Sequence, residues 1–158
     1  MAYEDPENTL VIETTKGPVV IQMRPDLAPN HVAHIKKLVR EGFYDGIVFH
    51  RVIDGFMAQT GDPNGTGTGG SSYPNLKQEF NAEPHVRGTV SMARAQNPDS
   101  ANSQFFICFD DARFIDRQYT VWGKVIEGME NVDQIKRGEP VRDPDRMVSV
   151  KVAADIAA

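Results

Sequence analysis

Arg51 is the residue whose chemistry most needs an explanation, because it lies within an apolar, strand-like run, Phe49-His50-Arg51-Val52-Ile53. A guanidinium stays protonated at any working pH, and taking it out of water costs several kcal/mol unless acceptors surround it. Arg51 therefore either has a fixed acidic partner or faces a cleft. The segment alone leaves both interpretations open with about equal weight: a structural ion pair with Asp54 or Asp62, or a functional cation.

The residues after Arg51 are suited to line such a cleft. Gly55 allows a kink, after which Phe56 and Met57 can supply apolar walls. Gln59 can supply a neutral amide that orients the guanidinium. This order of residue types indicates a held cation beside an apolar pocket.

The composition excludes several classes of protein. The chain has 158 residues and a formal net charge of -5, which predicts a single domain over 1–158 and opposes binding to nucleic acid or to membranes. No stretch reaches membrane-spanning length, and the acidic first residues do not form a signal peptide. We therefore expect a cytoplasmic monomer, with residues 1–8 as a flexible tail.

Cys108 is the only cysteine, which excludes an internal disulfide and a cysteine-based structural zinc site. Its apolar run, residues 104–109, predicts a buried and inert thiol. Neither Cys108 nor Ser103 has the surrounding sequence of a hydrolase nucleophile. Hydrolytic chemistry is therefore not expected.

The four histidines are the other candidates for metal binding or proton transfer. His31 and His34 are three residues apart on a predicted helix, but two imidazoles without a third ligand are usually a solvated helix face. His50 and His85 are expected to be structural or exposed. The sequence thus predicts no metal site.

The elements that must position Arg51 and its neighbours are indicated by short β-branched runs and by two helical patterns. Residues 9–14 and 19–23 suit a hairpin. Residues 29–41 suit a helix that ends at Gly42 and covers a core with its apolar face. Further candidates are strands at the segment around Phe49, 88–93, 104–109, 119–126 and 148–155, and a second short helix at 129–135. Many short strands with two helices favour an antiparallel barrel whose ends the helices plug.

Residues 63–74 form the one glycine-rich stretch, with Gly65, Gly67, Gly69 and Gly70. Glycines permit positive φ and a close approach of the backbone. No Gly-Lys-Ser/Thr follows, so the stretch does not read as a phosphate-binding loop. We expect a long surface loop that lines a groove.

Four separated segments together resemble the cyclophilin family of peptidyl-prolyl cis-trans isomerases. They are 49–62, 67–70, 102–107 and 119–125. The likeness extends from about Thr9 to Val152. It implies a mainly β fold, a closed antiparallel eight-stranded barrel capped by two α-helices, and an activity that needs no cofactor.

The resemblance also implies roles for individual residues. It makes Arg51 the catalytic group, with Gln59 and Phe56 beside it. The positions that bind substrate fall into a proline pocket and a groove for the residues before proline, and they are Met57, Gly67, Ala93, Arg94, Ala95, Gln104, Phe106, Phe114, Ile115 and Tyr119.

Three of these positions depart from the family pattern. Phe114 stands where many members have Trp, so binding of a cyclosporin-type ligand should be weakened. Tyr119 replaces a common His, and we expect activity to survive because the phenol keeps a ring and a hydrogen-bonding group. Arg94 replaces a frequent Asn, which would bias the groove toward acidic residues in the substrate.

The implied partners are proline-containing polypeptides and unfolded or folding proteins, in which proline isomerisation limits folding. Rotation about a prolyl bond meets a barrier of roughly 18–20 kcal/mol, and a cation that donates to the twisted nitrogen would lower it. The alternative is a non-catalytic module that only binds proline peptides, although an intact Arg51 argues against it. A general chaperone would need a large exposed apolar patch, of which the charged helix faces give no sign.

Overall fold

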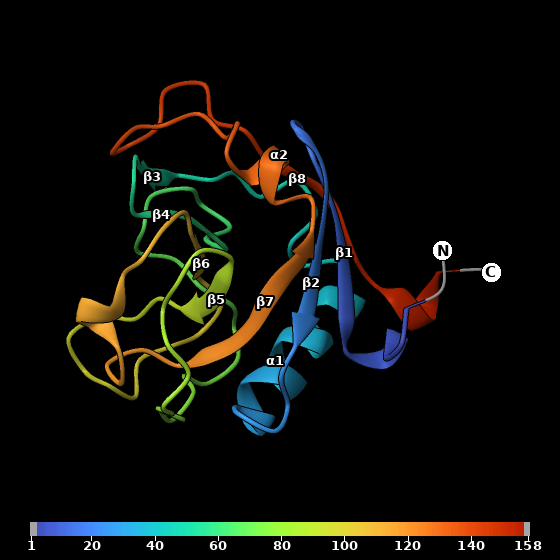
Figure 1. The fold of residues 1–158 in the computed structure, drawn as a ribbon, viewed down its shortest axis with the longest axis vertical. Helices are drawn as coiled ribbons and strands as arrows, with labels where there is room; N and C mark the ends of the chain where they lie inside the picture. Colours follow the sequence, from blue (N-terminus) through green and yellow to red (C-terminus); the bar gives the residue numbers. More distant parts are fainter. Residues whose placement is uncertain (1–2, 157–158) are drawn as a thin grey trace.

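The computed structural model describes residues 3–156 (Figure 1). Its centre is one antiparallel sheet of eight strands with two α-helices and three short 3-10 helices around it. In chain order the elements are η1 (Pro6–Asn8), β1 (Thr9–Thr14), β2 (Gly17–Met23), α1 (Pro29–Arg40), β3 (Arg51–Ile53), β4 (Met57–Thr60), β5 (Thr89–Met92), β6 (Phe105–Cys108), η2 (Arg113–Ile115), β7 (Val121–Glu127), α2 (Met129–Val132), β8 (Met147–Val152) and η3 (Ala153–Asp155).

The first two strands form the predicted hairpin. Leu10 pairs with Ile21 and Thr14 pairs with Gly17, so the apolar side chains of both strands enter the core from one face. The turn closes where the Thr14 hydroxyl donates to the Gly17 carbonyl at 2.6 Å.

The sheet is open, so the prediction of a closed barrel was wrong. The strand order is β3-β4-β6-β5-β7-β2-β1-β8, and the two end strands do not pair with each other. The free edge of β3 is taken instead by the loop before β8. The N–H of Val52 donates to Gly138 O at 2.8 Å, and the N–H of Gly138 donates to Val52 O at 2.8 Å. A three-residue strand offers few groups for pairing, and these are already used. The segment before β3 meets the start of β8 instead, through an isolated bridge between Val48 and Arg146 and a hydrogen bond from the N–H of Met147 to Ile47 O at 2.9 Å.

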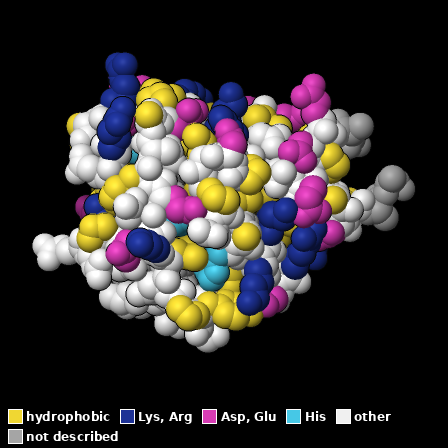
Figure 2. Space-filling view, turned by 90° about the horizontal axis from the view of Figure 1, so that it is seen from below, with side chains coloured by type: hydrophobic (Ala, Val, Ile, Leu, Met, Phe, Trp, Pro, Cys, Tyr) yellow, Lys and Arg dark blue, Asp and Glu magenta, His cyan; other side chains and the backbone are white. Residues whose placement is uncertain are grey.

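The first helix has the predicted position and amphipathic character. Val32, Ile35 and Leu38 are buried, as their helical spacing requires, and α1 packs against β8. Figure 1 shows α1 and α2 at opposite ends of the sheet. Seen from the α1 end, the surface carries basic and acidic side chains interspersed with apolar ones (Figure 2).

The second helix is shorter than the predicted 129–135. Only Met129–Val132 is α-helical, and the chain then tightens, because the N–H of Ile135 donates three residues back, to Val132 O at 3.1 Å. Ile135 is still buried. The apolar spacing therefore predicted correctly that Ile135 is buried, although the α-helix ends before it, at Val132.

The main core fills the space between the sheet and α1, with large side chains that include Tyr44, Phe49 and Phe105. Trp122 is fully buried there, with its ring edge-on to Phe105 at 5.4 Å between centroids. A second and smaller apolar cluster lies elsewhere, around Phe106. This second cluster belongs to the candidate site described below.

The segment predicted to be a flexible tail, 1–8, lies partly outside the described residues. Within the described part, η1 contacts α1, because Glu7 forms ion pairs with Lys36 at 2.5 Å and with Arg40 at 3.0 Å. Among residues 3–156, no helix combines the length and the apolar character needed to cross a membrane.

Candidate functional site

Three neighbouring strands place Arg51 in a row with two other predicted site residues. Arg51 on β3 lies opposite Gln59 on β4, and Gln59 lies opposite Phe106 on β6. Directly paired residues of adjacent strands project from the same face of a sheet. The row therefore joins a cation, an amide and an aromatic ring.

A chain of hydrogen bonds fixes this row. Nη1 of Arg51 donates to Oε1 of Gln59 at 3.1 Å, and Nε2 of Gln59 donates to Oε1 of Gln104 at 2.9 Å. Nε2 of Gln104 in turn donates to the carbonyl of Gly69 at 2.9 Å. Each amide accepts on one side and donates on the other, so the orientation of the guanidinium is linked to the glycine-rich loop.

Arg51 has an acidic partner that the sequence did not indicate. Its Nε donates to Oε2 of Glu139 at 2.6 Å. Neither predicted partner contacts it, since Asp54 pairs with Arg137 at 3.1 Å and Asp62 accepts hydrogen bonds from its own loop. Glu139 follows Gly138, whose backbone pairs with β3, and no local pattern links a residue so distant in sequence to Arg51. The Arg51 side chain remains 41% exposed, so the ion pair does not withdraw it from solvent.

An apolar cluster lies beside this cation, and it contains six of the predicted site residues. Its buried members are Met57, Phe106, Cys108 and Ala112, and its partly buried members are Ile53, Phe56, Ala93, Ile115 and Tyr119. Burial raises the pKa of the Cys108 thiol to about 12, so this cysteine is inert, as predicted. The cluster therefore offers an apolar surface with the Arg51 cation nearby.

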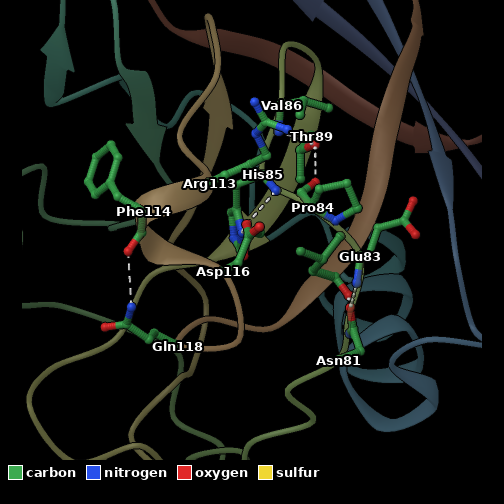
Figure 3. Close-up of polar contacts among 12 residues, drawn as sticks. Asn81, Glu83, Pro84, His85, Val86, Thr89, Arg113, Phe114, Asp116 and Gln118 are labelled. Carbon is green, nitrogen blue, oxygen red and sulfur yellow. Dashed lines mark hydrogen bonds and ion pairs between the residues drawn. The ribbon is translucent and has the colours of Figure 1, made fainter.

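His85 packs against this cluster. Of the two alternatives expected for it, structural or exposed, the structure excludes the exposed one. Its ring is fully buried and stacks on Phe106 at 6.1 Å between centroids. Figure 3 shows His85 directed toward Asp116, with Nδ1 at 3.0 Å from Oδ1. Burial lowers the pKa of His85 more than Asp116 raises it, so the imidazole is neutral at neutral pH.

Phe114 is separate from the buried part of the cluster. It is 71% exposed, and its ring lies at 5.5 Å from that of Phe56 between centroids. The amide of Gln118 donates to the Phe114 carbonyl at 3.1 Å, and the Phe114 ring points away from His85 (Figure 3). Phe114 therefore forms a rim, rather than a wall, of the apolar cluster.

A polar groove of about 530 Å³ adjoins the cluster, shares Ala93 with it and is also lined by Gln59. The predicted groove residues Gly67, Ala93, Arg94 and Ala95 all line it, and so does Gln104, which was predicted to help hold Arg51 and the substrate. One side of the groove is the glycine-rich loop, as predicted from its composition.

The carboxylate of Asp62 holds this loop in place. It accepts backbone hydrogen bonds from Asn64 at 2.8 Å, Thr66 at 2.9 Å and Gly67 at 2.6 Å. Although burial raises the pKa of Asp62, these donors outweigh it and bring the pKa to about 2. The loop is therefore an ordered wall around an ionised carboxylate.

Arg94 lies between the groove and the cluster. Its guanidinium is centred 4.9 Å above the ring of Tyr119. Its Nε donates to Gln118 O at 2.9 Å, and its Nη1 donates to the carbonyls of Ala95 at 2.9 Å and Gln96 at 3.1 Å. Among residues 3–156, Arg94 forms no ion pair with a carboxylate.

The helix histidines differ from the solvated face that was predicted. His31 is fully buried, and its Nδ1 lies 2.5 Å from Oε1 of Glu79, because α1 turns this side toward the segment before β5. His34 is half-buried. In the described part of the chain, no group of three metal-ligating side chains comes together.

Comparison with known proteins identifies the family. The sequence profile described as cyclophilin type peptidyl-prolyl cis-trans isomerase/CLD matches residues 9–154. The chain belongs to the cyclophilin family. As an enzyme of this family, it is a peptidyl-prolyl cis-trans isomerase.

Relatives of this cyclophilin agree over nearly the whole chain. A probable peptidyl-prolyl cis-trans isomerase of Brucella suis is 56% identical, over 96% of this chain and 85% of the relative. A peptidyl-prolyl cis-trans isomerase of Synechococcus elongatus is 44% identical, over 93% of this chain and 97% of the relative.

Solved structures are similar as well. A cyclophilin of Hirschia baltica superposes with a TM-score of 0.90 at 36% identity and covers 97% of this chain and 76% of its own. A cyclophilin of Cryptosporidium parvum, crystallised in the presence of the dipeptide Ala-Pro, superposes with a TM-score of 0.85 at 27% identity and covers 91% of this chain and 98% of its own.

Proposed function

We propose that this cyclophilin lowers the barrier to prolyl rotation by directing the guanidinium of Arg51 at the imide nitrogen of a proline held in the apolar cluster around Phe106. The observation that carries this proposal is the row of Arg51, Gln59 and Phe106 on three neighbouring strands. It sets a cation with fixed orientation at the edge of a small apolar surface.

The chemistry follows from the electronic structure of the amide. In the planar ground state the nitrogen lone pair is delocalised into the carbonyl, and twisting localises it on nitrogen. A guanidinium N–H can then donate to that lone pair, which it cannot do in the planar state. The interaction stabilises the twisted state selectively, which is the condition for catalysis. No bond is broken, so a nucleophile, a general base and a cofactor have no step to perform.

The remaining site residues fit the binding of a chain on either side of that bond. Met57, Phe106 and Ile115 would enclose the proline ring, while Gly67 and Ala95 would hold the preceding residues in the groove. The presence of Ala-Pro with the Cryptosporidium parvum cyclophilin supports proline-containing polypeptides as substrates. Unfolded and folding proteins are the expected clients.

The test is the exchange rate between the cis and trans forms of an Ala-Pro peptide, measured by NMR exchange spectroscopy. Arg51→Ala should lower the catalysed rate by about a hundredfold, as expected for the loss of one transition-state donor. Arg40→Ala is the matched control, because its side chain is 40% exposed against 41% for Arg51 and is also ion-paired. It should leave the rate unchanged.

Two results would count against the proposal. If folded Arg51→Ala exchanges the peptide as fast as wild type, the cation does not assist the rotation. If wild type binds the peptide without speeding exchange, the alternative of a non-catalytic proline-binding module is correct.

A further inference from the structure

His85 makes a clamp that the proposed mechanism does not use. Its backbone N–H and its Nδ1 both contact Oδ1 of Asp116, at 2.7 Å and 3.0 Å. Its Nε2 lies 3.0 Å from the hydroxyl of Ser91 on β5. With Nδ1 as the donor to the carboxylate, Nε2 is the acceptor from Ser91, so the contacts select one neutral tautomer.

The clamp joins two parts of the proposed pocket that are otherwise separate in sequence. Asp116 directly follows η2, which carries Phe114 and Ile115. A further bond runs between the same segments, because the N–H of Ala112 donates to His85 O at 2.9 Å. The start and the end of the η2 turn are therefore both tied to His85, as Figure 3 shows for Asp116.

The imidazole also supports the floor of the pocket. It stacks on Phe106 with an interplanar angle of 19° and meets Tyr119 edge-on at 6.5 Å between centroids. Both rings belong to the apolar cluster. One buried side chain thus contacts the floor directly and holds the η2 wall through a carboxylate.

We propose that His85 is a positioning residue for proline binding, which acts through Asp116 to hold Ile115 and the rest of η2 at a fixed distance from Phe106. The inference rests on the proposed assignment of the pocket. Its consequence is specific: loss of the clamp should widen the pocket and weaken substrate binding, while Arg51 and its partners on β3 and β4 stay in place.

The same three groups do not form a hydrolytic triad. Ser91 and His85 are both fully buried, so neither can reach a substrate carbonyl. Nucleophilic catalysis requires an accessible hydroxyl. The arrangement of serine, histidine and aspartate therefore serves positioning.

The chain contains a matched control for this clamp. His31 is likewise fully buried, and its backbone N–H and Nδ1 contact the same oxygen of Glu79, at 2.8 Å and 2.5 Å. None of the α1 residues belongs to the apolar cluster. Substitutions at His31 and Glu79 thus reproduce the loss of a buried clamp away from the pocket.

The experiment compares steady-state kinetics on an Ala-Pro peptide for His85→Phe and Asp116→Asn with those for His31→Phe and Glu79→Gln. The pocket variants should raise KM by about tenfold, the effect of one lost charge-assisted hydrogen bond, and leave kcat within about twofold. Amide hydrogen exchange at Ile115 and Asp116, which donate to Ala112 and Arg113, should become faster. The control variants should show neither change, although they lose stability.

Each outcome bears on the inference. Unchanged KM in a folded pocket variant would overturn it, and so would an equal rise of KM in the His31 and Glu79 variants. Asp116→Asn keeps the imidazole, so it remains informative if His85→Phe fails to fold. Peptide-induced NMR shifts of Phe106 and Ile115 in wild type test the pocket assignment separately, because their absence would refute that assignment rather than the clamp.

Discussion

Among the described residues that line the polar groove, Arg94 is the one with a charged side chain. Three backbone carbonyls and the ring of Tyr119 hold its guanidinium, but carbonyls do not cancel its charge. The competing charge is Asp62, whose side chain lies under the loop and is committed to backbone donors. The accessible charge of the groove is therefore positive in a chain with net charge -5.

We predict a preference for acidic residues before the proline. The ratio of kcat/KM for Ala-Glu-Ala-Pro to that for Ala-Lys-Ala-Pro peptides should be about three- to tenfold, the range of a partly exposed charge interaction. It should approach one in Arg94→Gln and at high salt. Lys151→Gln, which removes an exposed positive charge from β8, is the control. A ratio of one in wild type at low salt would refute the preference.

Phe114 is the second position whose side chain sets ligand choice. Its exposed ring offers apolar contact and no donor. Phe114→Trp should therefore tighten binding of cyclosporin by about tenfold, the effect of one added hydrogen bond with more apolar area, while the exchange rate of an Ala-Pro peptide changes little. Calorimetric titration measures the affinity, and equal affinities would show that the rim does not limit binding.

The sequence allowed some residues of the candidate site to be proposed, but not all of their contacts. Arg51 and Gln59 could be proposed from local residue order, and Phe106 from the resemblance to the cyclophilin family. The strand register then brings the three together. Glu139 and the clamp of His85 on Asp116 could not be assigned, because both are contacts between segments far apart in sequence. Nothing local distinguishes a buried histidine with a carboxylate partner from an exposed one.

At the scale of elements, the approach of β4 to β6 depends on a residue without a side chain. Gly61 follows β4 with φ of +98°, and a Cβ there would overlap Ser103 O and lie 2.8 Å from Cα of Gln104. Gly55, in the turn between β3 and β4, has φ of +74° and open space around its Cβ position. Both glycines have a left-handed backbone conformation, but only at Gly61 would an added Cβ collide with neighbouring backbone atoms.

This difference gives a controlled prediction. Gly55→Ala should lower the free energy of unfolding by about 1–2 kcal/mol, the cost of a left-handed backbone, and Gly61→Ala should lower it by more than about 3 kcal/mol because backbone atoms must also move. Gly61→Ala should in addition slow peptide exchange, because Gln104 shifts away from Gln59. Urea denaturation and exchange NMR measure both. Equal losses of stability would show that the sheet tolerates the displacement.

The elements themselves show where sequence patterns stop being informative. The β1 and β2 hairpin and α1 were predicted within a few residues, because their periodicity is local. Closure of the barrel was predicted wrongly, since it depends on which backbone segment pairs with the edge of β3. Residues 138–141 reach it, and they carry no strand-like pattern.

At the scale of the whole molecule, the burial of histidine side chains makes the stability of the fold depend on pH. Burial is the main cause that lowers the pKa of His31, His34, His50 and His85 below the usual value of 6.5. The unfolded chain therefore takes up protons near pH 6.5, while the folded chain does so only at lower pH. For each such group stability is full above pH 6.5 and decreases as the pH falls from 6.5 toward the folded pKa.

We predict a loss of stability between pH 7 and pH 5. Each histidine that stays neutral in the folded state contributes about 1.4 kcal/mol per pH unit below 6.5. Urea denaturation at a series of pH values measures the slope, which His34→Gln should reduce. A free energy of unfolding that is constant from pH 7 to pH 5 would contradict the prediction.

The cytoplasmic location and the monomeric state remain predictions from the sequence.

The burial of Trp122 in the main core, beside Phe105 and away from the cluster around Phe106, gives the protein a built-in optical reporter. It is the single tryptophan of the chain, so the intrinsic emission comes from one shielded indole and should move to longer wavelength only when the core opens to water. Substrate peptides that occupy the cluster should leave the emission unchanged. The folded state of this isomerase can therefore be monitored by its intrinsic tryptophan fluorescence while it acts on another protein that lacks tryptophan.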